Sequence, residues 1–426
     1  MRYTTMPRRP GPRQPGGFYG WHVTGFAAVL LVATAPGQTA GVSTFIDPMI
    51  ADLGVDRSTI STAYLIGTMT GAIVVPRIGG LIDKWGVRRC TLVIGAAFGA
   101  VLLAMGTIGG FTGLLFGFMG IRSLGQGALG LAATTAAARW FDRRRGRALG
   151  IVSAAGTAGI SLAPVLSEWI ISQAGWRTAW FVLGLAVWAL VLPVATWGLR
   201  DDPSDLGQVP DGGVQHDDSP ALQRWGFTRR QAFREPYFWV LSSGLAVSGM
   251  LSTAVAFHQI NLLGAKGLTA TEAAANFIPQ TLAGLLATMV VGNMIDRVNI
   301  RWVVLTSMVL HAGALAWLTV VEPGWSAIGF GIAIGAAGSS IRIAEAAAIP
   351  AYFGVLHLGS IRGFVASISV GSTALGPLLF SVGKDITGSF DDVILVTLVL
   401  PVAVAVAGLI FRVPERPGAD GVVVSP

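Results

Sequence analysis

GGLIDKWGVRR, residues 79–89, recurs in the second half of the chain as GNMIDRVNIR, residues 292–301. Three pairs of matching residues are separated by nearly the same offset, 213 or 212 positions: Asp83 and Asp296, Pro164 and Pro377, and Phe141 and Phe353. A nearly constant offset over three markers argues for a duplicated chain better than any single match does. The sequence therefore predicts two parallel repeats of one architecture.

The composition places both repeats in a membrane. Hydrophobic residues make up 53% of the 426 residues and charged residues only 12%, whereas a soluble domain is about 25% charged. The 57 glycines suit transmembrane helices, which approach one another closely through small residues. Cys90 is the single cysteine, which excludes an internal disulfide framework and a multi-cysteine metal site. These features argue against a soluble enzyme.

Twelve apolar stretches are long enough to cross a bilayer, which requires about 20 mostly apolar residues. The predicted spans are residues 20–46, 58–80, 89–109, 112–138, 147–172, 177–199, 237–263, 270–293, 301–320, 326–351, 361–387 and 391–412. They lack the alternation that marks transmembrane strands. We therefore expect an all-α membrane protein with twelve transmembrane helices in two six-helix repeats, and we interpret the first stretch as a span and not as a cleaved signal peptide.

The basic residues predict the orientation in the membrane. If the N-terminus is cytoplasmic, 23 of the 29 Lys and Arg residues lie on the cytoplasmic side. The opposite side carries four: Arg57, Arg177, Lys266 and Lys384. This bias satisfies the positive-inside rule, so we expect a protein of the cell (plasma or inner) membrane with both termini in the cytoplasm. The net charge of +7 lies in short clusters between apolar runs, so we expect no nucleic-acid partner.

These features divide the chain into five segments. We expect a cytoplasmic N-terminal segment over residues 1–19 and a six-helix half over 20–199. Residues 200–236 are rich in Asp, Pro, Gly and Arg without apolar periodicity, which predicts a cytoplasmic linker. The second six-helix half follows over 237–412, and a cytoplasmic tail over 413–426.

The repeated stretch resembles the signature loop of the major facilitator superfamily, commonly Gly-x-Leu-x-Asp-Arg-x-Gly-x-Arg-Arg, and the resemblance covers about residues 18–412. It implies that this loop latches the cytoplasmic side in one conformation. The implied latch residues are Gly79, Asp83, Gly86 and Arg88, with Asp296 and Arg297 in the second copy. The alternative is that these charges only anchor helix ends.

Four further stretches look like the monocarboxylate-porter branch and its oxalate/formate-antiporter-like relatives: GGFYGW (16–21), PGQTAGVSTF (36–45), WFDRRRGRALGIVSAAGTAG (140–159) and YFGVLHLGSIRG (352–363). That resemblance implies a small organic anion that is moved with a proton or exchanged for another anion. One feature departs from the branch, whose members often carry an arginine in the eighth helix. Residues 270–293 contain no Arg or Lys, which argues against transport of a monocarboxylate by the arrangement usual in that branch.

Polar residues inside the spans are the candidates for the transport path. Arg122 lies about ten residues into its span, where an isolated charge costs at least ~2.5–3.5 kcal/mol, so it must face a partner or a wet cavity. It either has a direct role in substrate binding or proton coupling, or anchors to backbone carbonyls. Gln38 follows a predicted break of the first helix at Pro36 and Gly37. Gln38 and the freed backbone groups could bind a polar substrate, or the break could be a kink that only shapes packing.

Three more polar side chains are substrate-binding candidates. His258, near the outer end of its span, could titrate near neutral pH, or it could simply be interfacial. Asn276 and Gln280 are four residues apart on one face of the eighth span. Interhelical hydrogen bonds would explain these two amides as well as ligand contact does.

Arg342 and Glu345, in GSSIRIAEAAAIP, are three residues apart and point to one side of the tenth helix. Two charges inside the membrane are costly unless they pair or are wet. They could simply pair with each other. Alternatively, Arg342 supplies the cationic site that the eighth helix lacks, and Glu345 couples a proton to the anion.

We therefore expect a secondary active transporter of a small organic anion that works by alternating access, with its substrate site open first to one side of the membrane and then to the other. The alternatives are a transporter of a neutral or hydrophobic molecule and a transport-dead membrane sensor. No enzyme motif, cofactor motif or metal cluster stands out. The expected partners are the substrate, protons and membrane lipids, and we expect a monomer.

Overall fold

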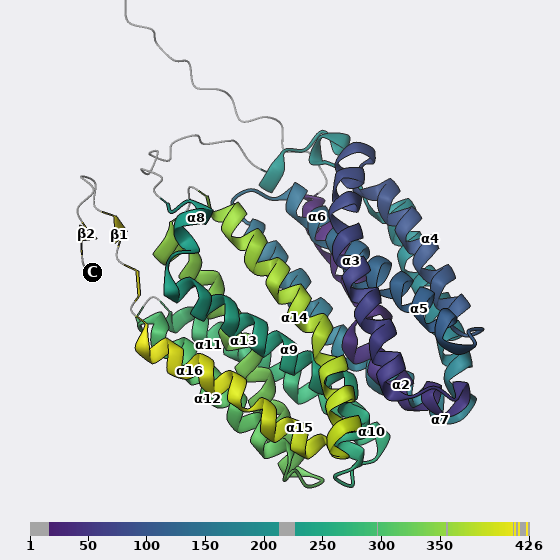
Figure 1. Ribbon diagram of the computed structural model, residues 1–426. Helices are drawn as coiled ribbons and strands as arrows, with labels where there is room; N and C mark the ends of the chain where they lie inside the picture. Colours follow the sequence, from purple (N-terminus) through teal and green to yellow (C-terminus); the bar gives the residue numbers. More distant parts are fainter. Residues whose placement is uncertain are drawn as a thin grey trace, which may run out of the picture.

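The computed structural model describes residues 17–212, 226–295, 297–354, 357–411 and 413–414, with two short strands in the tail. The described chain is built from helices (Figure 1). Strands β1 (Arg416–Pro417) and β2 (Val423–Val424) form a two-residue antiparallel pair next to the C-terminus.

The first half contains six membrane-spanning segments. The first is broken, as predicted at Pro36 and Gly37, because a 3₁₀ turn over Ala35–Gly37 and an extended Gln38 separate two helices. The helices of this half are α1 (Gly20–Val32), α2 (Thr39–Leu53), α3 (Arg57–Trp85), α4 (Val87–Met105), α5 (Gly110–Gly120), α6 (Gly130–Trp140) and α7 (Arg145–Pro193). A π-helical turn over Ile121–Leu129 joins α5 and α6 into the fourth span, and another over Val194–Gly198 extends α7.

The length of α7 explains how eleven long apolar helices give twelve spans. The described residues contain eleven helices that are long and apolar enough to cross a membrane, and one of them runs for 54 residues from Arg145 to Gly198. Gly175 breaks this helix with φ 79° and ψ 163°, a conformation that side chains with a Cβ rarely adopt. The prediction of an all-α protein with twelve spans in two repeats is confirmed.

The second half follows after a linker. Its helices are α8 (Arg229–Ala232), α9 (Pro236–Gly264), α10 (Ala270–Ala275), α11 (Phe277–Met294), α12 (Ile300–Leu318), α13 (Trp325–Phe353), α14 (Leu358–Thr387), α15 (Phe390–Thr397) and α16 (Val399–Ile410). In the linker, 3₁₀ turns cover Pro203–Leu206 and Pro210–Gly212.

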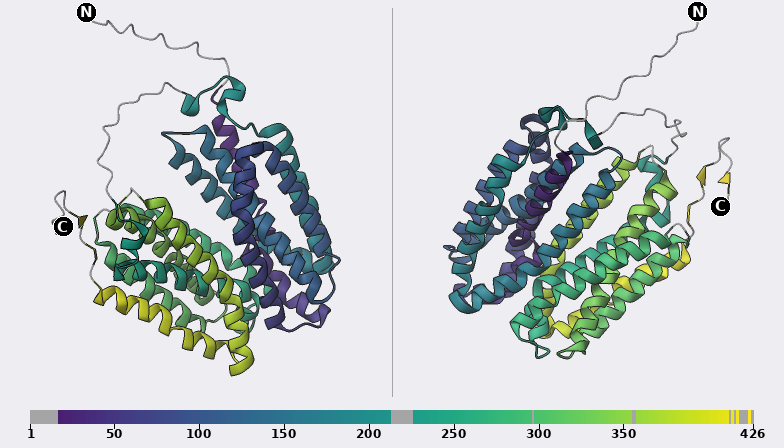
Figure 2. Two further views of the ribbon diagram at one scale, coloured as in Figure 1. Left: turned by 45° about the horizontal axis from the view of Figure 1, so that its top comes forward. Right: turned by 180° about the vertical axis from the view of Figure 1, so that it is seen from behind.

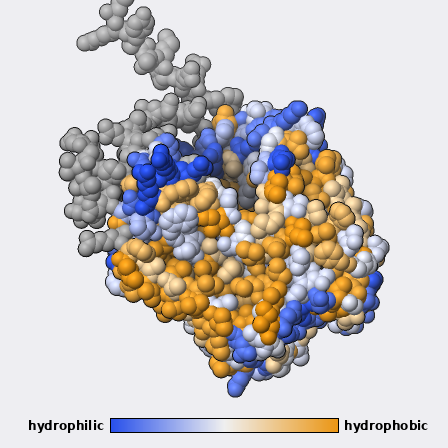
Figure 3. Space-filling view, viewed as in Figure 1, coloured by the Kyte–Doolittle hydropathy of each residue, from blue (hydrophilic) through white to orange (hydrophobic). Residues whose placement is uncertain are grey.

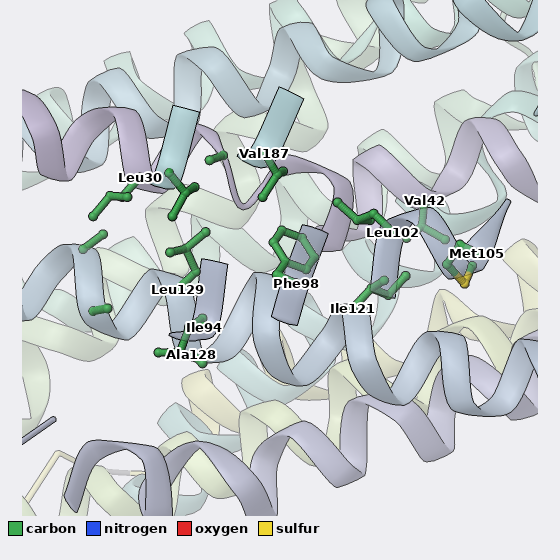
Figure 4. Close-up of a cluster of buried hydrophobic side chains, with 14 of the residues drawn as sticks. Leu30, Val42, Ile94, Phe98, Leu102, Met105, Ile121, Ala128, Leu129 and Val187 are labelled. Carbon is green, nitrogen blue, oxygen red and sulfur yellow. The ribbon is translucent and has the colours of Figure 1, made fainter. Parts of the chain in front are cut away.

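Each half has its own apolar core. In the first half, Phe98 and Leu102 of α4 pack with Ile121 of the fourth span and Val187 of α7 (Figure 4). The second half contains two clusters, one around Phe238 and Phe353 and the other around Leu251, Phe330 and Phe380. The outer surface is largely apolar (Figure 3), and it carries exposed large side chains such as Phe116, Trp169, Leu286 and Ile410. This exterior suits a protein embedded in lipid.

The two halves lie side by side and converge at one end (Figures 1 and 2). Helix α3 of the first half packs against α14 of the second, and α2 packs against α9. Toward the end that carries α8 and the linker, α3 and α14 separate, and the surface is hollowed between the halves (Figure 3). We call the end at which α3 begins and α14 ends the closed end, and the opposite end the open end.

Candidate functional site

His258 of α9 lies in the contact between the halves at the closed end. Its side chain is 1% exposed, and Nε2 donates to the carbonyl of Pro377 in α14 at 3.0 Å. Because Nε2 donates, the neutral ring presents Nδ1 as an acceptor, and Arg57 of α3 lies 3.4 Å from Nδ1. Arg57 also pairs with Asp47 of α2. The predicted substrate-binding residue His258 therefore bridges the two halves in this conformation.

Two further contacts hold the closed end together. Ser61 of α3 and Ser381 of α14 share a hydrogen bond of 2.6 Å, and both hydroxyls are buried. Nearer the surface, Ser58 donates to Asp385. Four elements, α2, α3, α9 and α14, thus meet through polar groups. An opening of the closed end must break these bonds.

Arg122 holds the broken first span together from within the first half. The residue is 4% exposed, and its guanidinium donates to Thr68 Oγ1 at 2.9 Å and to the Gly37 carbonyl at 3.0 Å. The same group lies 4.5 Å above the ring of Tyr64. The carbonyl that the helix break frees is therefore satisfied by Arg122. This arrangement matches the anchoring role that the sequence left open beside substrate binding.

Gln38 is half-buried immediately after the break, and its amide donates to Thr34 Oγ1 at 3.0 Å. The crossing of the first and fourth spans is close at this point. A Cβ on Gly37 would lie only 2.6 Å from the carbonyl oxygen of Ile121, so only glycine fits there. The break thus packs against the fourth span and leaves Gln38 beside it.

Asn276 and Gln280 belong to a chain of amides that joins α9, α10, α11 and α13. Gln280 donates to Gln259 Oε1 at 2.8 Å and to Asn276 Oδ1 at 3.0 Å. Gln259 donates to the Ala273 carbonyl at 2.8 Å, and Asn276 to the Ala327 carbonyl at 2.7 Å. The amides satisfy one another, which favours the interhelical explanation over ligand contact for this pair.

Arg342 and Glu345 of α13 do not pair with each other within the described chain. Arg342 is exposed, although Ile341 and Ala344 beside it are buried, and it donates to Ser339 Oγ at 2.9 Å. Glu345 is 6% exposed, and the cation within electrostatic range is Arg362 of α14. An exposed guanidinium without a carboxylate partner in the described residues is the feature expected of an anion site.

The structure adds residues to this region that sequence reasoning missed. His311 of α12 is fully buried, and its Nδ1 lies 3.4 Å from Ser248 Oγ of α9. Ser252, one turn further along α9, is half-buried and lies near Arg342. The only sequence signal for His311 is that it is a single histidine in an apolar run. Ser248 and Ser252 carry no such signal.

The residues of the first copy of the predicted latch lie at the open end, and the polar partners of Asp83 and Arg88 in the described chain belong to the first half and the linker. Asp83 pairs with Arg139 of α6 at 3.4 Å. The Arg88 backbone donates to Asp201 of the linker at 2.9 Å, and a Cβ on Gly86 (φ 83°) would collide with that carboxylate. Gly79 is half-buried in α3. In the second copy, Arg297 is exposed, and Asp296 lies outside the described residues.

Asp211 ties the linker to the loop before α7. Its carboxylate accepts hydrogen bonds from three successive backbone N–H groups, those of Asp142, Arg143 and Arg144. Burial raises the pKa of Asp211, but these bonds and the Arg144 charge outweigh it, so that the pKa lies below its usual value. The start of the linker is thus held against the first half.

Comparisons with known proteins agree with this architecture. The sequence model of the Major Facilitator Superfamily matches residues 26–278. The chain is 27% identical to the oxalate:formate antiporter of Oxalobacter formigenes over half of this chain and 49% of that protein. It is 26% identical to monocarboxylate transporter 11 of Mus musculus over 92% of this chain and 86% of that protein. Across three bacterial relatives, the antiporter among them, the chain spans less than half of each relative's own length.

A solved structure shares the fold. It is a bacterial homolog to the human lysosomal transporter Spinster, in an inward-facing and unoccupied conformation. The two chains superpose with a TM-score of 0.69 over 93% of this chain and 97% of that chain, at 15% sequence identity. At this identity the likeness concerns the fold.

Proposed function

Because the chain belongs to the Major Facilitator Superfamily, we propose that it moves a small organic anion, a carboxylate, across the membrane. The chain is an integral membrane transporter by its family and fold, and the transporters that share them are not enzymes. The relatives that act on oxalate, formate and monocarboxylates support an anionic substrate.

Arg342 is the observation that carries this proposal. It supplies a guanidinium on the inner side of the second half, next to α9, and no carboxylate in the described chain pairs with it. A guanidinium binds carboxylates through two parallel N–H groups. An arginine in α13 would replace the cation that the eighth span lacks.

The contacts at the two ends suggest how access alternates. In the described conformation, the Arg57–His258 and Ser61–Ser381 contacts close one end while the other end is hollow. The reverse state would break these contacts and bring the latch residues Asp83 and Arg88 toward the second half. Arg122, with its bonds to the broken first span, would keep the first half rigid during this motion.

Orientation and coupling belong to the same proposal. The bias of the basic residues supports an orientation with the open end and both termini in the cytoplasm, and a location in the plasma or inner membrane of the cell. Glu345, buried near Arg342, would carry the coupled proton if the protein is a symporter. The protein would work as a monomer, and anion exchange is the alternative to proton symport.

Flux measurements in proteoliposomes test the proposal. Radiolabelled formate, acetate, lactate and oxalate would be offered to wild-type protein, to Arg342→Ala and to Arg145→Ala. Arg145 is the matched control because it is an exposed arginine at the start of α7 that pairs with Asp142 in the preceding loop. We expect saturable uptake of at least one carboxylate, lost in Arg342→Ala and kept in Arg145→Ala. Uptake of none of them, or equal uptake by Arg342→Ala, would refute an anion transporter centred on Arg342.

A further inference from the structure

Gly338 of α13 leaves a small space beside Arg342. A Cβ built on Gly338 would have three nearest neighbours, at 3.5 Å from Ser252 Oγ, 3.7 Å from Arg342 Nη1 and 3.9 Å from Ser248 Oγ. All three distances are ordinary van der Waals contacts, so the space accepts one atom the size of a methyl group without displacing anything. Its nearest neighbours are all groups that can donate a hydrogen bond.

Two of these donors are held in place by further side chains. Arg342 Nη2 donates to Ser339 Oγ at 2.9 Å, which fixes the guanidinium above the space. His311 Nδ1 lies 3.4 Å from Ser248 Oγ, and His311 Nε2 is buried with no hydrogen-bond partner in the described chain. If Nδ1 carries the ring proton and donates to Ser248, the serine hydroxyl hydrogen is free to point toward the space.

We propose that the space above Gly338 is an oxyanion subsite, in which one carboxylate oxygen of the substrate accepts hydrogen bonds from Arg342, Ser252 and Ser248. The Cβ point lies one bond length from the Gly338 Cα, so a substrate oxygen would lie farther out, in van der Waals contact with the Cα and within hydrogen-bond range of the donors. A side chain at Gly338 would overlap with it, so glycine is required there. His311 is a positioning residue that orients Ser248. This assignment rests on the proposed function. It puts the carboxylate of the substrate between Ser248 and Ser252 of α9 and Arg342 of α13.

Alanine at Gly338 is a sharp test because the added methyl fits the space. The carboxylate that most raises the unfolding temperature of the wild-type protein, among formate, acetate, lactate and oxalate, is the probe. Without the probe, Gly338→Ala should unfold at or above the wild-type temperature, because alanine favours a helix interior more than glycine does. It should bind the probe about tenfold or more weakly, because the probe loses charge-assisted hydrogen bonds. Gly313→Ala is the matched control, because a Cβ there meets nothing within 4 Å. It should bind like the wild type.

Variants of the donors separate this subsite from the wider proposal. Ser252→Ala keeps the space open and should weaken binding severalfold. His311→Gln can still hydrogen-bond to Ser248 and should bind more tightly than His311→Phe, which cannot. If Gly338→Ala and Ser252→Ala bind the probe normally while Arg342→Ala does not, the subsite is wrong and the proposed function stands. If Arg342→Ala also binds normally, both fail.

Discussion

Arg342 and Glu345 lie three residues apart on α13, and within the described chain they do not form an ion pair. The guanidinium donates to Ser339 at 2.9 Å and is exposed, whereas the carboxylate of Glu345 is buried. A charge pair inside a membrane protein normally satisfies itself. The separation of these two leaves Arg342 without a carboxylate partner in the described chain, whereas Glu345 has Arg362 of α14 within electrostatic range.

Glu345→Gln should uncouple the proton from the anion. A buried carboxylate is neutralised when it takes up a proton, so in wild-type protein anion binding should strengthen as the pH falls. The glutamine keeps the shape but does not titrate, and we expect binding that no longer changes with pH. Anion affinity measured by thermal shift between pH 5 and pH 8 checks this. A variant with the wild-type pH profile would show that the proton binds elsewhere.

Arg57→Ala should loosen the closed end. The substitution removes the contact to His258 of the other half and the ion pair with Asp47, and so favours the state in which this end opens. A cysteine placed at Ser61, in a background in which Cys90 is replaced by serine, should react faster with a water-soluble maleimide. Arg177→Ala is the control, since Arg177 pairs with Asp52 inside the first half. Equal labelling of both variants would contradict the assigned contact.

Asp83→Asn should reduce transport while the protein stays folded. Asp83 is exposed and pairs with Arg139 in the same half, and such surface pairs contribute about 0–1 kcal/mol to stability. A role in latching the halves would therefore appear in flux and in cysteine labelling at the open end, not in the unfolding temperature. Unchanged flux and labelling would leave Asp83 with the helix-anchoring role alone.

Arg122→Ala should destabilise the protein itself. It leaves the Gly37 carbonyl and the Thr68 hydroxyl without their buried donor, and each such loss costs about 1–3 kcal/mol. Lysine keeps the charge but cannot reach both partners with a planar fork, so Arg122→Lys should unfold at an intermediate temperature and turn over slowly. Wild-type unfolding of both variants would show that Arg122 does not brace the broken span.

The sequence predicted the architecture well because its signals are periodic and repeated. The copies at Asp83 and Asp296, the length of the apolar runs and the helix break at Pro36 each depend on local sequence. The candidate site was harder to predict, because it depends on which helices pack together. His311 was missed because it is an isolated polar residue in α12. Its link to the candidate site depends on the packing of α9 and α13, which bring Ser248 and Arg342 near it.

The same limit explains the polar residues whose roles the sequence left open. Asn276 and Gln280 share a face, as predicted, but that face meets Gln259 of α9 and the backbone of α13. His258 lies near the end of its helix, as predicted, yet its partners Arg57 and Pro377 come from segments far away in the chain. Spacing along one helix identifies a shared face and does not identify what that face contacts.

Binding of a carboxylate to purified protein tests the central claim most directly. Thermal unfolding would be followed for wild type, Arg342→Ala, Arg342→Lys and Arg145→Ala while formate, acetate, lactate or oxalate is titrated. A specific ligand at a hundred times its dissociation constant stabilises the folded state by about 2.7 kcal/mol. We predict that one carboxylate raises the unfolding temperature of wild type and Arg145→Ala, has a smaller effect on Arg342→Lys and none on Arg342→Ala. An equal rise in Arg342→Ala would contradict the account, because the anion would then bind without the cation on which the site depends.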